Sequence, residues 1–477
     1  MLKTFVSSDD IRSHFAAAMS EMYRREVPQY DLLLELVSRV NDNVLKSNPP
    51  LRRQLAASGD LHRLSDERHG AIRLGTSEEL STIRRIFAVM GMFPVDYYDL
   101  VQVGLPVCAT AFRPVTDVAL ARNPFRMFTS LLQLDLIERD DVRSDARKAL
   151  GSRSICSRRL LQLLNQAESD GLTQASATEF ISEAVKTFKW HSEATVSAER
   201  YLDLSQSHPL VADIVSFQGP HINHLTPRTL DIDAVQSQMP LIGMTPKDAI
   251  EGPPRRRCPI LLRQTSFLAL DEPILFINEA GGSRAGSHTA RFGEIEQRGA
   301  ALTPQGRNVY DTLLNSLQQE CHLSATPVTA AQRKTALERL FATFPDTHEE
   351  LRASHLAYYR YRATDLARRN RRQARAARSL DELIVDGQLD YAPCTYEDFL
   401  PVSAAGIFQS NLRSNEGTYE GNSRARSDFE QDLGAKIINA FDLYAELETA
   451  SLARALDDVG ASRLMPPAVQ DVMKSPK

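Results

Sequence analysis

The stretch ERHGAIRLGTSEELSTIRRIFAVMGMFP, residues 67–94, predicts a strand followed by a helix. A loop that begins around Ser58 leads into the strand, which ends near Leu74. The next residues, TSEE from Thr76, have the pattern of a capping box at the start of a helix. Pro94 is expected to stop that helix. Between these signals, apolar residues recur at the spacing of one helix face, at Leu80, Ile83, Phe87 and Met90.

Outward from this stretch, β-like and helical regions alternate along the chain. Helical periodicity covers 9–47, and β-like pieces bounded by Pro and Asn cover 105–113 and 126–136. Helical patterns from about 141 to 204 separate them from a second β-rich region, about 213 to 303. This order predicts an α+β fold. The expected domains are N-terminal helices (1–57), the first half of a β core (58–140), a helical insertion (141–205), the second half of the core (206–303) and a mainly helical C-terminal region contributing to the pocket (304–477).

Composition restricts the class of partner. The chain has 56 basic and 61 acidic side chains, so its net charge of −5 offers no general attraction for nucleic acid or an anionic membrane. Its five scattered cysteines lack metal-ligand spacing and fit a reducing compartment. We find no signal peptide and no apolar stretch of membrane-spanning length. We therefore expect a cytoplasmic protein that binds no nucleic acid and no membrane, and the oligomeric state stays open.

Two histidines and a glutamate in β-like stretches, His69, His224 and Glu294, are candidate ligands of a divalent metal. Such a set leaves coordination positions open for substrate and oxygen. Each residue alone is weak evidence, because a histidine on a strand is more often structural than a ligand. On a strand, His221 and His224 would face opposite sides, so only one could enter a common pocket. Glu294 and Glu296 share a face, so periodicity does not choose between them.

Five motifs together resemble a known family. They are ERHGAIRLGT (67–76), VMGMFPVDYYDL (89–100), HINHLTPRT (221–229), RFGEIEQRGAALT (291–303) and PVSAAGIFQSNL (401–412). In this order they are similar to the 2-oxoadipate dioxygenase/decarboxylases, or 2-hydroxyglutarate synthases, of the vicinal oxygen chelate superfamily. The resemblance implies that the β core is of the vicinal-oxygen-chelate kind and binds a metal.

The resemblance also implies roles for single residues. His69, His224 and Glu294 would bind iron(II), Fe(2+), with the glutamate placed as in the FLEIIQR-like strand of the related 4-hydroxyphenylpyruvate dioxygenases. Arg73 would be the catalytic substrate clamp. It follows His69 by four, so on a strand both point to one side with Cα atoms about 13 Å apart, and its guanidinium could hold a distal carboxylate. The substrate-binding set would be His69, Arg73, Val402 and Ser403, the last two through backbone groups.

The reaction that the resemblance implies is an oxidative decarboxylation. A 2-oxo acid, 2-oxoadipate, would react with O2 to give D-2-hydroxyglutarate and CO2, within lysine catabolism. The nearest alternative is another metalloenzyme of the superfamily, an extradiol-type dioxygenase or a lyase. A more distant one is a non-catalytic binding protein that uses the arginine-rich run 367–378, which we interpret as a solvated helix face.

Several remaining features suggest no chemistry. GGSRAG, residues 281–286, lacks the spacing of a phosphate-binding loop and is interpreted as a turn between strands. His191, His208 and His288 have no partner at a ligand spacing and are expected to be structural.

Overall fold

The structure is a computed structural model that describes residues 4–267, 271–277, 282–289, 291–323, 328–369, 377–400 and 424–465. The chain divides into two compact units. Unit 1 comprises Met1–Gly252, Arg263–Gln297 and Asp398–Ile438, and unit 2 comprises Pro253–Leu262, Arg298–Glu397 and Asn439–Lys477. Both units contain helices and strands, so the predicted α+β class is confirmed.

Unit 1 contains a five-stranded sheet with the order β2-β3-β4-β1-β5. Strands β1 and β4 run parallel, and the other neighbours are antiparallel. All residues of β3 and β4 are buried, so both faces of the sheet are covered at these two strands. The strands are β1 (Arg68–Leu74), β2 (Phe93–Asp99), β3 (Val107–Arg113), β4 (Arg126–Leu132) and β5 (Leu225–Pro227).

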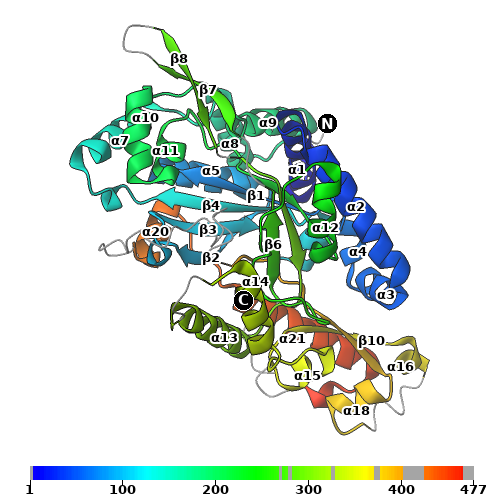
Figure 1. Cartoon of the computed structure of the whole chain (residues 1–477). Coiled ribbons are helices and arrows are strands. Elements are labelled where there is room, and N and C mark those ends of the chain that lie inside the picture. The colour runs from blue at the N-terminus through cyan, green and yellow to red at the C-terminus, as the bar shows by residue number, and fades with distance from the viewer. Residues whose placement is uncertain are drawn as a thin grey trace. The chain divides into compact units, whose positions relative to one another are not determined.

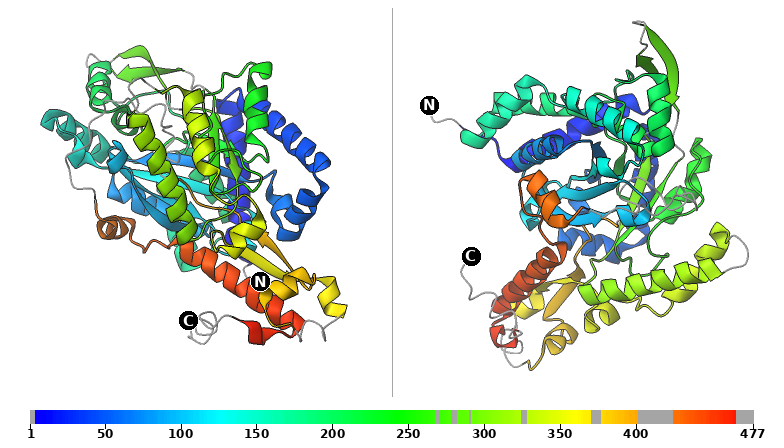
Figure 2. Two further views of the ribbon diagram at one scale, coloured as in Figure 1. Left: turned by 60° about the horizontal axis from the view of Figure 1, so that its bottom comes forward. Right: turned by 90° about the vertical axis from the view of Figure 1, so that its left-hand side faces the viewer.

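The helices of unit 1 precede, connect and follow these strands, and Figures 1 and 2 show α1, α8 and α9 over the sheet. They are α1 (Ser8–Glu26), α2 (Tyr30–Ser47), α3 (Pro49–Ser58), α4 (Asp60–Arg63), α5 (Ser77–Val89), α6 (Asp117–Arg122), α7 (Asp140–Ser152), α8 (Arg158–Ser169), α9 (Gln174–Thr187), α10 (Ala198–Ser207), α11 (Pro209–Val215), α12 (Ile232–Gln238) and α20 (Arg426–Leu433).

The two faces of β1 have different neighbours. Ile72 and Leu74 belong to the main apolar core, together with residues of α1, α2, α5, α8 and α9. Successive side chains of a strand alternate between faces, so His69 and Arg73 point to the opposite side. The prediction that these two side chains share a side agrees with this register. The apolar helices thus cover one face of the sheet, and the polar candidates occupy the other.

The strand–helix prediction around Thr76 is confirmed, but the capping box is only half formed. The Thr76 hydroxyl accepts a hydrogen bond from Glu79 N at 3.2 Å. The Glu79 carboxylate instead accepts from Gly75 N at 2.8 Å and pairs with Arg153, with Nε–Oε1 at 2.6 Å. In a complete capping box, the Glu79 carboxylate would accept a hydrogen bond from the Thr76 amide. Here it pairs with Arg153 instead.

The second β-rich region contains more helix and irregular chain than its residues suggested. Residues around 213 lie in α11, and α12 follows β5. His221 and His224 precede β5 in a segment without regular structure, so the argument that they face opposite sides of a strand was wrong. The remaining strands are short: β6 (Leu262–Ser266) pairs with β9 (Glu294–Arg298), and β7 (Glu272–Ile277) pairs with β8 (Ser283–His288).

Strands β7 and β8 form a hairpin that projects from the body of unit 1 (Figure 1). Residues 283–286, predicted as part of a turn, are therefore strand residues. The tip of the hairpin lies outside the described residues. Because Ser and Gly are poor strand formers on their own, pairing with the apolar β7 decides their conformation.

Unit 2 combines helices with a two-stranded antiparallel sheet. Among the described residues of both units, no helix is long and apolar enough to cross a membrane. The elements of unit 2 are α13 (Pro304–Leu323), α14 (Ala330–Phe341), α15 (His348–Ala353), β10 (Tyr359–Ala363), α16 (Asp365–Arg369), α18 (Leu380–Val385), β11 (Leu389–Pro393) and α21 (Ala440–Val459).

Candidate metal centre

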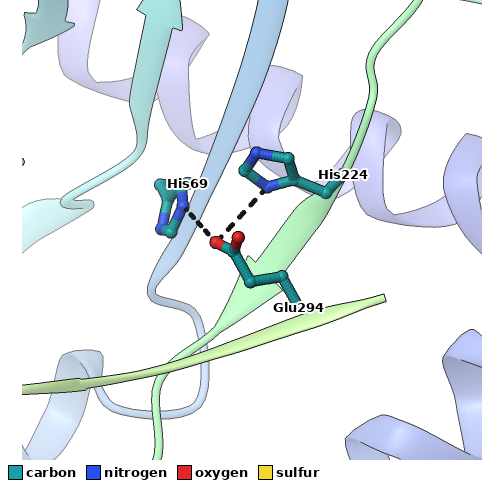
Figure 3. Close-up of side chains that lie close together, drawn as sticks. All are labelled: His69, His224 and Glu294. Carbon is teal, nitrogen blue, oxygen red and sulfur yellow. Dashed lines mark ion pairs between the residues drawn. The ribbon is translucent and has the colours of Figure 1, made fainter. Parts of the chain in front are cut away.

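Three side chains that lie far apart in the sequence meet inside unit 1. His69 lies on β1, His224 directly precedes β5, and Glu294 begins β9 (Figure 3). All three are 0% exposed, and one potential ligand atom of each lies within 4.8 Å of the others. Backbone pairing brings the segments together, since Thr226 is the register partner of His69 and Arg228 forms a bridge with Glu296.

Thr226 orients two of these side chains. Its hydroxyl donates to Glu294 Oε1 at 3.0 Å and lies 2.9 Å from Nδ1 of His224. Since the single hydroxyl proton is used on the carboxylate, Nδ1 of His224 is the donor of the second hydrogen bond. That tautomer leaves a lone pair on Nε2, which has no hydrogen-bond partner among the described residues. Such an imidazole is prepared to bind a metal through Nε2.

The two glutamates of β9 contact opposite nitrogens of His69. Glu294 Oε1 lies 3.0 Å from Nε2, and Glu296 Oε2 lies 2.8 Å from Nδ1. Of the two carboxylates, Glu294 is the one that also lies near His224, with Oε1 3.6 Å from Nδ1. A histidine that binds a metal through one ring nitrogen commonly donates the N–H of its other nitrogen to a carboxylate, which is called its outer partner here. Glu296 has the position of such an outer partner. The geometry therefore distinguishes the two glutamates, which periodicity could not.

Burial and charge set the protonation of the three groups. Burial lowers the pKa of His224 to about 4, so this imidazole is neutral at pH 7. Burial opposes ionisation of Glu294, yet His224 and His69 outweigh it and the pKa of Glu294 is lowered. Burial also lowers the pKa of His69, but the charges of Glu296 and Glu294 outweigh it, so that pKa is raised. Metal binding at His69 therefore competes with its protonation.

The donor set fits a divalent metal. It combines two imidazoles and one carboxylate, the facial set of non-haem iron enzymes. Two of its atoms, His224 Nε2 and Glu294 Oε2, are buried without a hydrogen-bond partner in the described part of the chain. Unsatisfied buried polar atoms are costly, and a bound cation would satisfy both. Gln264 supports the arrangement by donating to Glu294 Oε1 at 2.8 Å.

Arg73 lies on the same face of β1 as His69 and is 9% exposed. Its Nη1 atom lies 2.5 Å from Oδ2 of Asp213 on α11. The positive charge of Arg73 is among the causes that lower the pKa values of His224 and His208, after burial. The guanidinium is therefore close enough to the three candidate ligands to act on them electrostatically.

Sequence reasoning missed the partners of Arg73. Two histidines contact Oδ1 of Asp213. Nε2 of His221 lies 3.2 Å from this oxygen, and Nε2 of His288 lies 2.9 Å from it. The tandem histidines of HINH were a signal for His221. Nothing in the spacing pointed to Asp213 or His288, which come from a helix and a hairpin.

The predicted pocket residues Val402 and Ser403 lie outside the described residues. The chain directly before them is fixed next to the centre. Asp398 forms two contacts with Arg113, at 2.6 and 3.0 Å, and the ring of Phe399 lies 5.0 Å from that of His69. Phe399, which precedes the PVS segment by two residues, thus lies beside the first candidate ligand.

The family model for 2-oxoadipate dioxygenase/decarboxylase matches residues 15–411. The chain belongs to this family. Curated 2-oxoadipate dioxygenase/decarboxylases from Escherichia coli and Pseudomonas putida are each 51% identical to it, over 94% of this chain and 98% and 96% of their own lengths. One from Mycobacterium tuberculosis is 38% identical over 92% of this chain and 96% of its own length.

Solved structures agree with this membership. The hydroxyglutarate synthase from Pseudomonas putida in complex with 2-oxoadipate has 47% identity and a TM-score of 0.88, covering 96% of this chain and 99% of its own. An uncharacterised protein from Shigella flexneri has 48% identity and a TM-score of 0.84, covering 95% and 99%. The predicted family, and with it the prediction of an enzyme, is confirmed.

Proposed function

We propose that this chain converts 2-oxoadipate and O2 to D-2-hydroxyglutarate and CO2, with iron(II) held by His69, His224 and Glu294. The observation that carries the proposal is the buried centre of two imidazoles and one carboxylate in a chain of this family. A second support is Arg73 on the same face of β1. The relative solved with 2-oxoadipate shares 47% of its residues with this chain, which supports the choice of substrate.

The protein residues have separate tasks in this reaction. Bound iron(II) supplies a site that chelates the 2-oxo acid and reduces O2, so that decarboxylation and hydroxylation take place on one molecule. Thr226 and Glu296 fix the rings of His224 and His69, so the ligands need not reorganise. Complete burial of the three ligands keeps water away from the reacting atoms.

Arg73 binds the far end of the substrate in this proposal. A guanidinium has five donors in a fixed fork and pairs well with a carboxylate. With the 2-oxo acid end at the metal, a distal carboxylate would extend along β1 toward Arg73. We assign Val402 and Ser403 to the wall of the same pocket, where backbone groups would contact the substrate. His69 would flank the substrate as well as bind the metal.

The test is an anaerobic reconstitution with iron(II), followed by 2-oxoadipate and air. Oxygen uptake matched by CO2 and 2-hydroxyglutarate, identified by mass spectrometry, is the expected result. His69→Ala, His224→Ala and Glu294→Ala should each lose both iron and turnover, whereas the exposed His322→Ala should keep them. Bound iron without oxygen uptake would keep the metal site but reject 2-oxoadipate as the substrate.

The clamp has its own test. Arg73→Ala should raise KM for 2-oxoadipate at least about tenfold, because an interaction with a charged group is lost, and should keep its iron. Unchanged kinetics in this variant would reject the clamp while leaving the metal site intact.

A further inference from the structure

Asp213 is the centre of a second buried cluster beside the proposed clamp. It is 6% exposed, and its two oxygens have different partners. Oδ2 contacts Arg73, whereas Oδ1 contacts Nε2 of both His221 and His288. The four side chains come from β1, α11, the segment before β5 and β8. Side chains from β1, β8 and the segment before β5 therefore converge on the carboxylate of α11.

The cluster resembles a metal site in composition, since Asp213, His221 and His288 each have a ligand atom within 4.8 Å of the others. The charges of the cluster, however, disfavour metal binding. The guanidinium of Arg73 already neutralises the carboxylate at 2.5 Å, and a divalent cation on Oδ1 would face that positive charge in a buried site. Burial opposes ionisation of Asp213, but His221 and Arg73 outweigh it and hold its pKa well below the usual range. Asp213 is thus an anion whose partner is Arg73.

The histidines are themselves held in place. The Tyr201 hydroxyl lies 2.7 Å from Nδ1 of His288, and the indole of Trp190 stacks on the same ring with centroids 6.0 Å apart. Trp190 also contacts His221 edge-on, with centroids 4.8 Å apart. Rings packed in this way have little rotational freedom, so their Nε2 atoms present donors to Asp213 in a fixed position.

This cluster is connected to the candidate metal centre by a short stretch of backbone. His221 and the candidate ligand His224 belong to one segment. Between them, Asn223 N donates to Ala71 O at 3.0 Å, and Ala71 lies midway between His69 and Arg73 on β1. The same segment and the same strand therefore carry both the candidate ligands and the groups that hold Arg73. This connection sets the distance between the candidate ligands and the guanidinium of Arg73.

We propose that Asp213, fixed by His221 and His288, is a positioning residue for Arg73 and thereby selects 2-oxo acids by their length and distal charge. The inference rests on the proposed function, because it assumes that Arg73 binds the distal carboxylate. A guanidinium held by Asp213 keeps its fork at a constant distance from the candidate metal ligands. A 2-oxo dicarboxylate of matching length then reaches both the metal site and Arg73 without rearrangement. A shorter 2-oxo acid, or one without the distal carboxylate, does not.

The test compares substrates in one variant. In the iron-loaded enzyme, Asp213→Asn removes the charge and preserves the size of the side chain. We expect kcat/KM for 2-oxoadipate to fall at least about tenfold, mainly through KM, as for a misplaced binding group. The value for 2-oxohexanoate, which has the same chain length without the distal carboxylate, should change less than about threefold. The preference for the dicarboxylate should therefore fall by about the same tenfold factor.

A matched pair of variants tests the support from His288. His288→Gln can place an amide nitrogen near the position of Nε2 and should keep most of the preference, whereas His288→Leu should lose it as Asp213→Asn does. Glu79→Gln removes another buried carboxylate that pairs with an arginine, Arg153, and should leave the preference unchanged. If Asp213→Asn does not fold, the comparison of His288→Gln with His288→Leu decides the question.

The outcomes separate this inference from the proposed function. If Arg73→Ala leaves the preference for 2-oxoadipate intact, the clamp itself is wrong. If Arg73→Ala abolishes the preference but Asp213→Asn and His288→Leu do not, the clamp stands and the positioning role is overturned. Tighter binding of 2-oxoadipate by Asp213→Asn would overturn it too, because Asp213 would then compete with the substrate. Two metal ions per wild-type chain and one in Asp213→Asn would make the cluster a metal site instead.

Discussion

Replacing Glu296 by glutamine should weaken metal binding at His69 without removing a ligand. In the structure, Glu296 Oε2 lies 2.8 Å from Nδ1 of His69, while Glu294 contacts Nε2. Glutamine can still accept from Nδ1 through its carbonyl oxygen, but a charged acceptor becomes a neutral one. Hydrogen bonds to charged groups contribute about 1.5–3 kcal/mol and neutral ones about 0.5–1.5 kcal/mol. The midpoints of these ranges differ by about 1.25 kcal/mol, which corresponds to a Kd for the metal that is larger by nearly tenfold.

The assay is an anaerobic titration with iron(II) against a competing chelator, at a pH where His69 has lost its proton. Glu296→Ala should weaken metal binding further, by roughly 10- to 100-fold, as is typical when a hydrogen-bond partner of a metal ligand is removed. Glu294→Gln should be worse than both, because it removes a ligand. Since the Glu296 carboxylate raises the pKa of His69, Glu296→Gln should also lower the pH below which metal is lost.

The matched control is Glu272→Gln, which alters a carboxylate paired with Arg291 at 3.0 Å and should bind metal as the wild type does. Thermal unfolding of the metal-free variants separates loss of affinity from loss of fold. Metal binding by Glu296→Gln within about twofold of the wild type would refute the outer-partner role, since the charge difference should produce about tenfold. Tighter binding by Glu294→Gln than by Glu296→Gln would reverse the assignment of the two glutamates.

Three further predictions concern stability and the orientation of Glu294. Burial, aided by Arg73, lowers the pKa of His208 to about 4, below its ordinary 6.5. The contribution of His208 to folding stability is therefore present above pH 6.5 and is lost as the pH falls toward 4. Denaturant unfolding should show about 2 kcal/mol less stability at pH 5 than at pH 7 from this group. His208→Asn should keep the cap on Leu210 N and remove that loss, and an unchanged pH dependence would contradict the assignment. Thr226→Val should weaken metal binding in the same titration by about tenfold, because Glu294 loses a donor, and unaltered binding would exclude its orienting role. Gly299→Ala should destabilise unit 2 by more than about 2 kcal/mol in denaturant unfolding, because a Cβ there would lie 2.2 Å from backbone, and wild-type stability would show that the backbone yields.

Local patterns predicted the parts of the site that lie on one regular element. The alternation of β1 placed His69 and Arg73 on one side, and the register of the sheet agrees. Periodicity left Glu294 and Glu296 equivalent, because the difference between them is made by the two nitrogens of a histidine on another strand. That information is in the tertiary contacts and not in the spacing.

Other features could not be predicted because they depend on pairing between distant segments. His224 lies in irregular chain, whose conformation is fixed by contacts to β1 instead of a local propensity. Asp213 was expected in a β-rich region and lies in α11, while His288 ends a strand whose Ser and Gly residues suggested a turn. Asp213 and His288 come together near Arg73 through the tertiary fold, and their spacing in the sequence does not predict this.

The division of the chain has a consequence for the order in which the protein can form. Unit 1 is built from three stretches, and the last, Asp398–Ile438, follows a long stretch of unit 2. All three candidate ligands precede residue 298, yet the carboxylate that pairs with Arg113 and the ring that packs on His69 belong to that last stretch. A growing chain on the ribosome would therefore make every metal ligand long before it could complete the surroundings of the metal. Maturation of the centre thus requires synthesis to pass residue 398, and truncations before that residue would affect unit 1 as much as unit 2.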